Sequence, residues 1–576
     1  MPANILRKRS HLLAVTARLA VVSLTALVGD FGASAQNGSA YFYPGNLVVS
    51  RSVYVDTNNI TAGKTILPPA CSLANCPTPV TAVVGSAYPF VWNNDTVDSS
   101  FGITSKIFLD QITSLGTLIN SLEVPNSSQN GVPPTKDQMV TSFSSKSEMA
   151  LNLSTDGSAL TFMGYFAPIG AIDVSNSNTP GAIDPTNPVG ESAYRALAQV
   201  DQKGKFRFTL TNAYSGNNGR AAILNNTQDA NVYYTSGNAG NGANPQPAGI
   251  IVGAGAQILT PEVKAVAAQS PGTPTPVASF NITQLGLPHD KIGKDTNFRG
   301  LRIFNSVLYY TKGSGGNGIN TVYFVDSTGT VCHDAIAGVQ AANGVGLPVP
   351  GASLPTSGLA YDPTVVQTTG LPNNMCILKG FPTLLANSRT GVSYPFGIWF
   401  ANATTLYVAD EGNGNHGSTV ATFYTPAATQ NPTAGLQKWV FESGQWKLAY
   451  ILTKGLGLGI PYSVPNSPNG QTYPTGNNDG AGGTNFPWAP APDGLRNLTG
   501  VVNDDGTVTI YAITSTISGS GDQGADPNQL VAITDTLSAG GPNPPSGESF
   551  TILKIAAYGE VLRGVSWAPG TQVAGH

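Results

Sequence analysis

One strand–turn–strand pattern recurs along the chain and constrains its fold more than any other feature. It consists of a short apolar segment, a turn of Asn, Asp, Gly or Thr, and a strand rich in β-branched and aromatic residues. Its copies begin at Tyr394, Ser147, Gly219, Phe298 and Leu495. Alternation around turn residues is typical of antiparallel hairpins, and recurrence along a chain indicates a repeat architecture.

A second pair of strands is expected after most of these hairpins. Such pairs begin at Lys106, Arg195, Thr321 and Leu436, and segments from Gln529 and Phe550 form another. Four antiparallel strands per unit are the blade of a β-propeller. The units lie roughly 70 to 100 residues apart, whereas compact propellers repeat every 40 to 50 or so. We therefore expect long inserted loops, near 169–193, 237–247, 333–393 and 463–493.

The two ends of the repeat region are expected to complete one blade together. LRGVSWAP, from Leu562, reads as a first strand near the end of the chain, and GNLVVSRSVYV, from Gly45, reads as a second strand without a first. Joining them removes two exposed sheet edges. The prediction is an all-β, six-bladed β-propeller closed by N- and C-terminal strands in one blade. The count becomes seven if 333–393 contains a degenerate blade.

Composition excludes several classes of protein. Only 10% of the 576 residues are charged, compared with about 25% in an ordinary soluble domain. The 28 basic residues do not exceed the 32 acidic ones, and 41% of the chain is hydrophobic. A nucleic-acid partner and a disordered chain are both excluded on these grounds. After the first 35 residues, no segment reaches the roughly 18 apolar residues of a membrane-spanning helix, so no transmembrane segment is expected.

The N-terminal region and the cysteines predict an exported protein. Arg7, Lys8 and Arg9 precede an apolar stretch over 12–28 and a small-residue site that ends at Ala35. This is the pattern of a signal peptide, so residues 1–35 are expected to be removed and 36–576 to form one propeller domain, secreted or periplasmic. The most local disulfide pairing is Cys71 with Cys76 and Cys332 with Cys376; four free thiols are the alternative.

The fifth unit carries a family resemblance. Pro395-Phe396-Gly397-Ile398, followed by the LYVAD segment 406–410, resembles the signature of NHL-type and SMP-30/gluconolactonase-like six-bladed propellers. PGNLVV near the start, GLQKW after LYVAD, and LRGVSWAP at the end also resemble a group of exported bacterial propeller proteins with no assigned activity. The resemblance implies the fold more directly than a function, because propellers host lactonases, lyases, hydrolases and binding modules.

Aligning the six units places four arginines at one position just before the innermost strand. They are Arg220, Arg299, Arg496 and Arg563, and the other two units have Glu148 and Phe396 there. In propellers of the kind resembled, this position lies at the mouth of the central channel. Arg offers planar, bidentate donors to carboxylate, sulfate or phosphate, so the ring, with Glu148, is the predicted ligand site. The alternative is a packing residue paired within its own blade.

Candidates for catalysis and metal binding are less specific. The chain has no G-x-S-x-G, H-E-x-x-H, P-loop or Rossmann glycine motif. The catalytic candidates are Glu148, Asp493, Asp410, Glu411 and His416. SMP-30-like enzymes hold a divalent cation with Glu, Asn and Asp, and the resemblance makes Asp295, Asn297 and Asn497 candidates for a Ca²⁺ site. Four arginines nearby would oppose a cation.

Three functions agree with this sequence. The first is an exported propeller that binds an anionic small molecule or an acidic glycan at the channel mouth, and the absence of a nucleophile–base motif favours it. The second is a hydrolase, lactonase or lyase that uses acidic residues on the same face. The third is an adhesion or scaffold module of the cell envelope. A perturbed carboxylate or histidine in a deep pocket beside the arginines would favour the enzyme.

Overall fold

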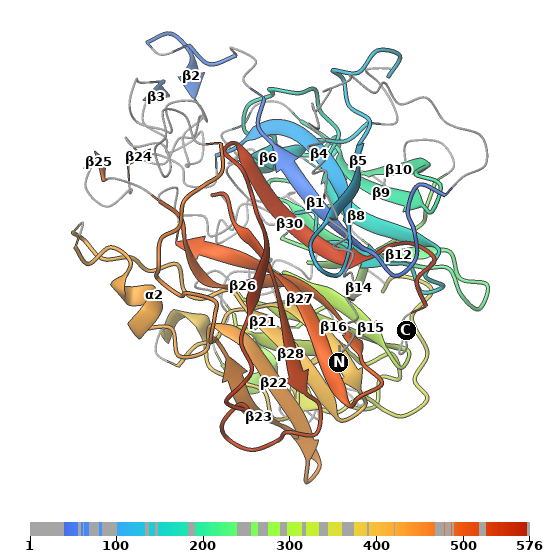
Figure 1. Ribbon diagram of the computed structural model, residues 1–576. Coiled ribbons are helices and arrows are strands. Elements are labelled where there is room, and N and C mark those ends of the chain that lie inside the picture. The colour runs from blue at the N-terminus through green and yellow to red at the C-terminus, as the bar shows by residue number, and fades with distance from the viewer. Residues whose placement is uncertain are drawn as a thin grey trace, which may run out of the picture. The chain divides into compact units, whose positions relative to one another are not determined.

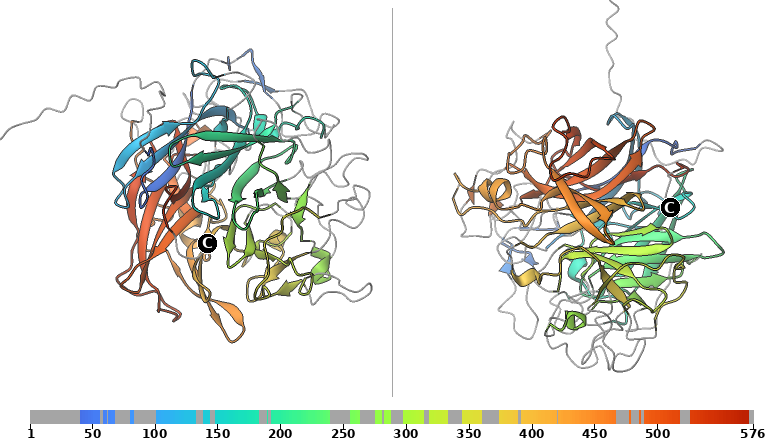
Figure 2. Two further views of the ribbon diagram at one scale, coloured as in Figure 1. Left: turned by 90° about the vertical axis from the view of Figure 1, so that its right-hand side faces the viewer. Right: turned by 90° about the horizontal axis from the view of Figure 1, so that it is seen from below.

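Six sheets arranged in a ring make up the computed structural model, a six-bladed β-propeller with very little helix (Figure 1). It describes residues 40–572, apart from short gaps and the longer ones at 68–79, 83–100, 133–137, 144–147, 183–188, 239–254, 263–274, 288–296, 314–317, 333–343, 360–373, 467–476, 479–484 and 518–525. The predicted signal peptide and Cys71 and Cys76 lie outside the described residues. Figure 2 shows the sheets from two further sides.

Four blades are four-stranded antiparallel meanders that run in chain order from the innermost to the outermost strand. Blade 2 comprises β7 (Asn152–Leu153), β8 (Ala159–Tyr165), β9 (Arg195–Asp201) and β10 (Phe206–Thr211). Blade 3 comprises β11 (Gly219–Asn225), β12 (Val232–Gly237), β13 (Ala256–Leu259) and β14 (Pro276–Ala278). Blade 5 comprises β20 (Pro395–Asn402), β21 (Thr405–Asp410), β22 (Gly435–Glu442) and β23 (Gln445–Leu452). Blade 6 comprises β26 (Ala491–Val502), β27 (Thr507–Ile517), β28 (Gln529–Thr536) and β29 (Thr551–Ile555).

Blade 1 closes the ring as predicted. Its innermost strand is the C-terminal β30 (Glu560–Trp567), which pairs antiparallel with the N-terminal β1 (Leu47–Val53). β4 (Ile103–Ile112) and β5 (Leu118–Glu123) follow outward, and the short β6 (Thr141–Phe143) also pairs with β4. The sheet therefore joins residues some 500 positions apart in the sequence, which removes two open edges.

A cluster of charges links the closing blade to its neighbour. Arg51 of β1 makes two bonds to Asp110 of β4, 2.7 and 3.0 Å long, and contacts Glu560 of β30 at 2.5 Å. Lys554 of β29, in blade 6, reaches Asp110 at 2.8 Å. We call these four residues the clasp. They connect both ends of the chain and two blades.

Blade 4 corrects one prediction made from the sequence. It contains β15 (Leu301–Phe304), β16 (Val307–Lys312) and β17 (Thr321–Val325), but the residues after β17 do not form the expected fourth strand. The Asp326 carboxylate instead accepts bonds from the backbone N–H groups of Thr328, Val331 and Cys332, so a turn forms where a strand was predicted. β19 (Met375–Leu378) takes the fourth place, and β18 (Val345–Gly346) pairs with it in parallel.

The predicted disulfide between Cys332 and Cys376 joins this turn to β19. Because β18 and β19 both belong to the fourth sheet, the described part of 333–393 contributes no further blade, and the count is six. Two small strand pairs lie outside the blades: β2 (Ile66–Leu67) with β3 (Val80–Thr81), and β24 (Asn477–Asn478) with β25 (Asn485–Phe486).

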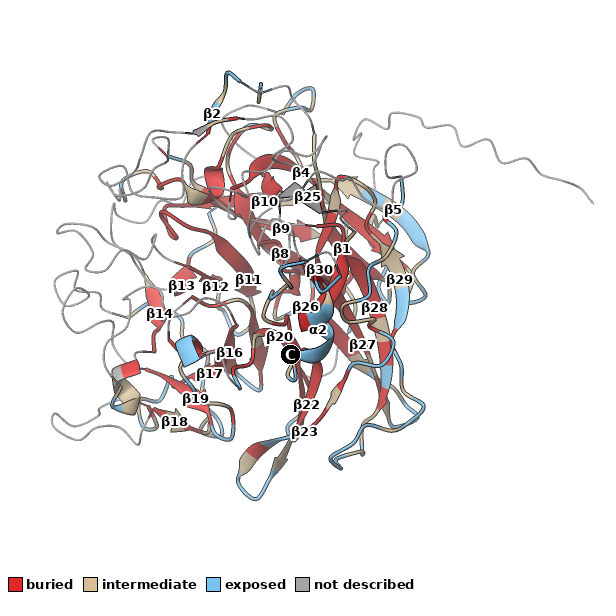
Figure 3. Cartoon of the chain, turned by 90° about the vertical axis from the view of Figure 1, so that its left-hand side faces the viewer, coloured by how far each residue is buried: buried red, intermediate tan, exposed pale blue. Residues whose placement is uncertain are grey.

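The hydrophobic core lies between neighbouring sheets. One cluster joins blades 3, 4 and 5, a second joins blades 6, 1 and 2, and a third joins blades 5 and 6. In Figure 3, β11, β20, β26 and β30 lie near the middle of the ring and are mostly buried, whereas β5, β14, β18, β23 and β29 lie at the periphery. The described helices are α2 (Thr425–Thr429) and the 3₁₀ turns Val174–Asn176, Ile282–Leu285 and Ala386–Ser388. No helix among the described residues is long and apolar enough to span a membrane.

Candidate functional site at the channel end

A β-bulge marks the aligned position in four of the six blades. Arg220, Phe396, Arg496 and Arg563 each lie where the register between the innermost strand and its neighbour shifts. A bulge inserts an unpaired residue and redirects its side chain, and bulges are common next to functional sites. In these four blades the alignment made from the sequence corresponds to one structural position, whereas Arg299 and Glu148 precede the first residues of β15 and β7 and mark no bulge.

The aligned residues adjoin a narrow cavity on the axis of the ring. The residue that follows each of Arg220, Arg299, Phe396 and Arg496 lines this cavity: Ala221, Gly300, Gly397 and Asn497. The innermost strands approach each other too closely here for larger residues. A Cβ on Gly397 would lie 2.6 Å from the Arg496 carbonyl oxygen, and one on Gly564 would lie 2.5 Å from the Leu151 nitrogen.

Glu411 lies between two of the ring arginines. Its carboxylate accepts a 2.9 Å bond from Nε of Arg496 and lies 3.7 Å from Nε of Arg299. Both guanidinium groups also lie over the Phe396 ring, with the guanidinium carbons 5.0 and 5.9 Å from its centroid. Three blades meet in this cluster, so the pairing is between blades and not within one. A simple anion site would have no carboxylate beside its arginines, but Glu411 lies next to Arg299 and Arg496.

Two further acids, Asp410 and Asp493, hold the loop that carries Glu411. The Asp410 carboxylate accepts bonds from Tyr394 N (2.8 Å), Gly412 N (3.0 Å) and the Gln437 amide (2.9 Å). Asp493 accepts bonds from Gly414 N and the Asn431 amide. Burial, together with the charge of Glu411, raises the pKa of Asp410 to about 6 although backbone bonds oppose the rise.

The other half of the ring surrounds Glu148. Its Oε1 accepts bonds from the Thr141 hydroxyl and the Ser142 backbone N–H, both 2.9 Å long. Arg563 donates to the Ser142 carbonyl oxygen at 3.1 Å, and Arg220 donates to the Phe298 carbonyl oxygen at 3.0 Å. These three residues are 1 to 5% exposed.

The charges of Glu148, Arg220 and Arg563 all act on the buried Tyr165 hydroxyl, so these groups surround one spot in blade 2. Burial is the main reason why the pKa of Tyr165 lies well above its ordinary value. Arg299 and Arg496 thus adjoin Glu411, whereas Arg220 and Arg563 lie in the part of the ring that contains Glu148. That arrangement depends on which blades become neighbours.

The predicted cation ligands are occupied by donors where the structure describes them. Oδ1 of Asn297 accepts a bond from Arg220, and Oδ1 of Asn497 accepts one from Val565 N. Asp295 lies outside the described residues. Within the described ranges there is no group of three or more His, Cys, Asp or Glu side chains that could hold a metal ion. The His416 ring stacks on Phe423, with 4.7 Å between centroids.

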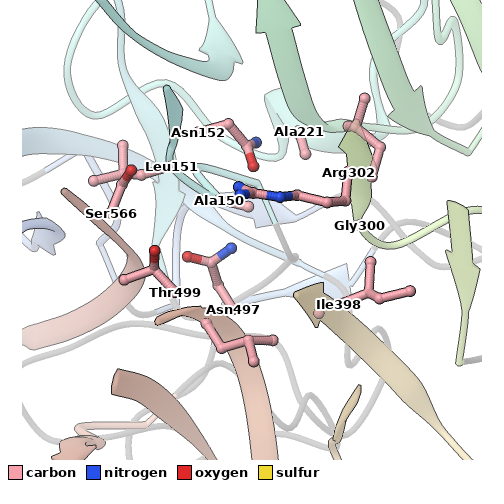
Figure 4. A pocket seen from close by; sticks show the side chains of 13 residues that line it. Ala150, Leu151, Asn152, Ala221, Gly300, Arg302, Ile398, Asn497, Thr499 and Ser566 are labelled. Carbon is pink, nitrogen blue, oxygen red and sulfur yellow. The ribbon is translucent and has the colours of Figure 1, made fainter. Parts of the chain in front are cut away.

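Sequence reasoning missed two arginines, Arg195, which is fully buried, and Arg302, which is partly buried. Arg195 lies under the Glu148 half of the ring, where it donates to the carbonyl oxygens of Ser177, Ala193 and Asn217. Arg302, on the innermost strand of blade 4, points into the axial cavity (Figure 4). The only signal in the sequence was the position of Arg302 in an otherwise apolar strand, LRIF.

No protein-family model matches this chain, and no curated protein matches it either. The six-bladed arrangement agrees with the fold that the resemblance in blades 1 and 5 implies. Function therefore has to be inferred from the geometry of the site.

Proposed function

We propose that this protein is an exported binding protein that holds an anionic small molecule at the end of the propeller channel. Four guanidinium groups on equivalent positions of four blades are the observation that carries the proposal. Two glutamates, Glu148 and Glu411, lie among these arginines. A carboxylated, sulfated or phosphorylated sugar can accept the planar donor pairs that Arg presents.

The two halves of the ring have different roles in this proposal. Glu411 orients Arg299 and Arg496 against Phe396, which reduces the entropy lost when they bind a ligand. The test substitutes Arg220 and Arg563, which are also buried, so the Tm of each variant without ligand is measured to separate a loss of stability from a loss of affinity. Replacing Arg299 or Arg496 would leave the buried Glu411 with less compensation and would confuse binding with stability.

The test is a thermal-shift screen of the purified protein with glucuronate, galacturonate, sulfated and phosphorylated monosaccharides, and Ca²⁺. A ligand at a hundred times its Kd stabilises the folded state by about 2.7 kcal/mol, which raises Tm measurably. Arg220→Gln and Arg563→Gln should each weaken binding of the active compound by about 10 to 100-fold, since a charge-assisted bond contributes roughly 1.5 to 3 kcal/mol.

Arg207→Gln is the matched control, because Arg207 is exposed on the outermost strand of blade 2. It should leave the affinity unchanged. Stabilisation by Ca²⁺ alone, or equal affinity in all three variants, would contradict the proposal. An acidic polysaccharide added in the same screen separates a glycan from a free sugar acid as the ligand.

A second candidate, hydrolysis or lyase chemistry on the same face, has one observation in its favour. Asp410 is a buried carboxyl whose pKa is raised to about 6, directly beside Glu411 and its arginines. Its three hydrogen-bond donors occupy the oxygens that a substrate would need, which favours a supporting role. Turnover of a compound that stabilises the protein, detected by chromatography, would favour catalysis over binding.

A further inference from the structure

Arg302 occupies an unusual place for a charged residue. It lies on β15, the innermost strand of blade 4, and its side chain extends across the axial cavity (Figure 4). All six blades contribute to the lining, and every lining residue except Arg302 is uncharged. Arg302 keeps part of its surface accessible within the cavity, yet burial alone lowers its pKa to about 10.

The Arg302 guanidinium has no counter-charge in the described part of the chain. Its buried Nε has no hydrogen-bond partner there, and no ion pair or ring contact involves this residue. A charge removed from water costs several kcal/mol unless a partner compensates it. Arg195, which is fully buried, shows the usual solution, because carbonyl oxygens surround its guanidinium. Arg302 lacks such a shell.

Other hydrogen-bond donors face the same cavity. Oδ1 of Asn497 is engaged by Val565 N, which turns the Asn497 amide nitrogen toward Arg302 (Figure 4). The hydroxyl groups of Thr499 and Ser566 line the cavity as well and make no hydrogen bond to any described residue. Oδ1 of Asn152, an acceptor, also faces the guanidinium, while the amide nitrogen of Asn152 donates to Ala222 O.

We propose that the axial cavity is a binding site for one compact inorganic anion, with chloride as its representative, held by Arg302, Asn497, Thr499 and Ser566. A positive charge and three neutral donors around one space match the requirements of an anion. The cavity volume is about 10 Å³, at the lower limit of the roughly 10 to 15 Å³ that one water molecule needs on this measure. Chloride and bromide are somewhat larger than water, so either ion requires a small outward shift of the lining side chains, whereas sulfate, phosphate and sugar acids are far too large.

This site is independent of the proposed ligand site, because it uses none of the ring arginines. It would neutralise the centre of the ring, where the innermost strands of all six blades converge. Anion binding is thus expected to stabilise the whole propeller, since only the closed ring brings the four donors together.

The first test is a crystal grown in sodium bromide, in which the anomalous signal locates the ion. A bromide peak within hydrogen-bond distance of the Arg302 guanidinium is the expected result. Water alone at that position, under saturating bromide, would overturn the proposal. This measurement uses the unaltered protein and so does not depend on whether a variant folds.

The second test measures Tm against sodium chloride, with sodium methanesulfonate keeping the ionic strength constant. The unaltered protein should gain stability with chloride until the effect saturates. Arg302→Met should lose this gain and, without chloride, should be at least as stable as the unaltered protein, because the substitution removes an uncompensated buried charge. Arg207→Met, the exposed control, should keep the full chloride response.

A chloride response that survives in Arg302→Met would refute the site. Binding of the sugar acid found in the thermal-shift screen should be unchanged in Arg302→Met. If the screen finds no sugar acid but the bromide peak is present, the channel-end proposal fails and the axial site stands. If the screen finds a sugar acid but no bromide peak is present, the axial site fails and the channel-end proposal stands.

Discussion

The clasp offers a quantitative test of how the ring is closed. Asp110 is completely buried and accepts bonds from Arg51, Lys554 and the Ser121 hydroxyl. Burial by itself would raise the pKa of Asp110. The hydrogen bonds and charges of Arg51 and Lys554 outweigh this effect and lower the pKa from 3.8 to about 2. Each pKa unit corresponds to about 1.36 kcal/mol, so ionised Asp110 contributes about 2 to 3 kcal/mol to folding.

The sign of the pH dependence follows from the direction of that change. Because the pKa is lower in the folded state, the contribution is complete above about pH 4 and is lost as the pH falls through about 2. Asp110→Asn should therefore destabilise the protein by about 2 to 3 kcal/mol at pH 7, and by progressively less between pH 4 and pH 2.

Urea unfolding followed by tryptophan fluorescence measures this effect as a change in the midpoint at constant m-value. Glu442→Gln is the control, since Glu442 forms an exposed pair with Lys447 at 3.4 Å and should change stability by less than about 0.5 kcal/mol. A loss below about 0.5 kcal/mol for Asp110→Asn at pH 7, or a loss that does not shrink in acid, would refute the reasoning.

Two other buried charges give further predictions. Lys438 is fully buried and donates to Asp535 (2.8 Å) and the Tyr450 hydroxyl (3.0 Å) between blades 5 and 6. Lys438→Met should lower the free energy of unfolding, measured in urea, by about 3 to 5 kcal/mol, because it leaves Asp535 buried without its cation. Adding Asp535→Asn should restore part of this loss. A double variant less stable than Lys438→Met alone would contradict the prediction. Asp410, with its pKa raised to about 6, loses its contribution to stability as the pH rises from about 4 through 6. The stability of Asp410→Asn relative to the unaltered protein should rise by about 3 kcal/mol over that interval, measured as midpoints at pH 4, 5, 6 and 7; a constant difference would contradict the assignment.

The strands, their turns and the closure of the ring were predictable because they depend on short-range patterns. Ser443 and Gly444, for example, adopt positive φ in the turn between β22 and β23, as that dipeptide indicates. The pairing of β1 with β30 was also predictable, since a first strand without a second and a second without a first can only complete each other. The failure in blade 4 came from one carboxylate, Asp326, which takes up backbone N–H groups that a strand would need.

The candidate site was also predictable only in part from the sequence. A repeated position was visible in the alignment, and it identified four arginines that lie at equivalent places beside the channel. Three facts were decided only when the blades became neighbours: Glu411 lies between Arg299 and Arg496, Glu148 lies near Arg220 and Arg563, and Arg302 faces a cavity without a carboxylate. Local patterns report which face of a strand is buried, whereas the partner of a charge depends on contacts between distant segments, such as Glu411 and Arg496, which are 85 residues apart. Such contacts exist only in the closed ring.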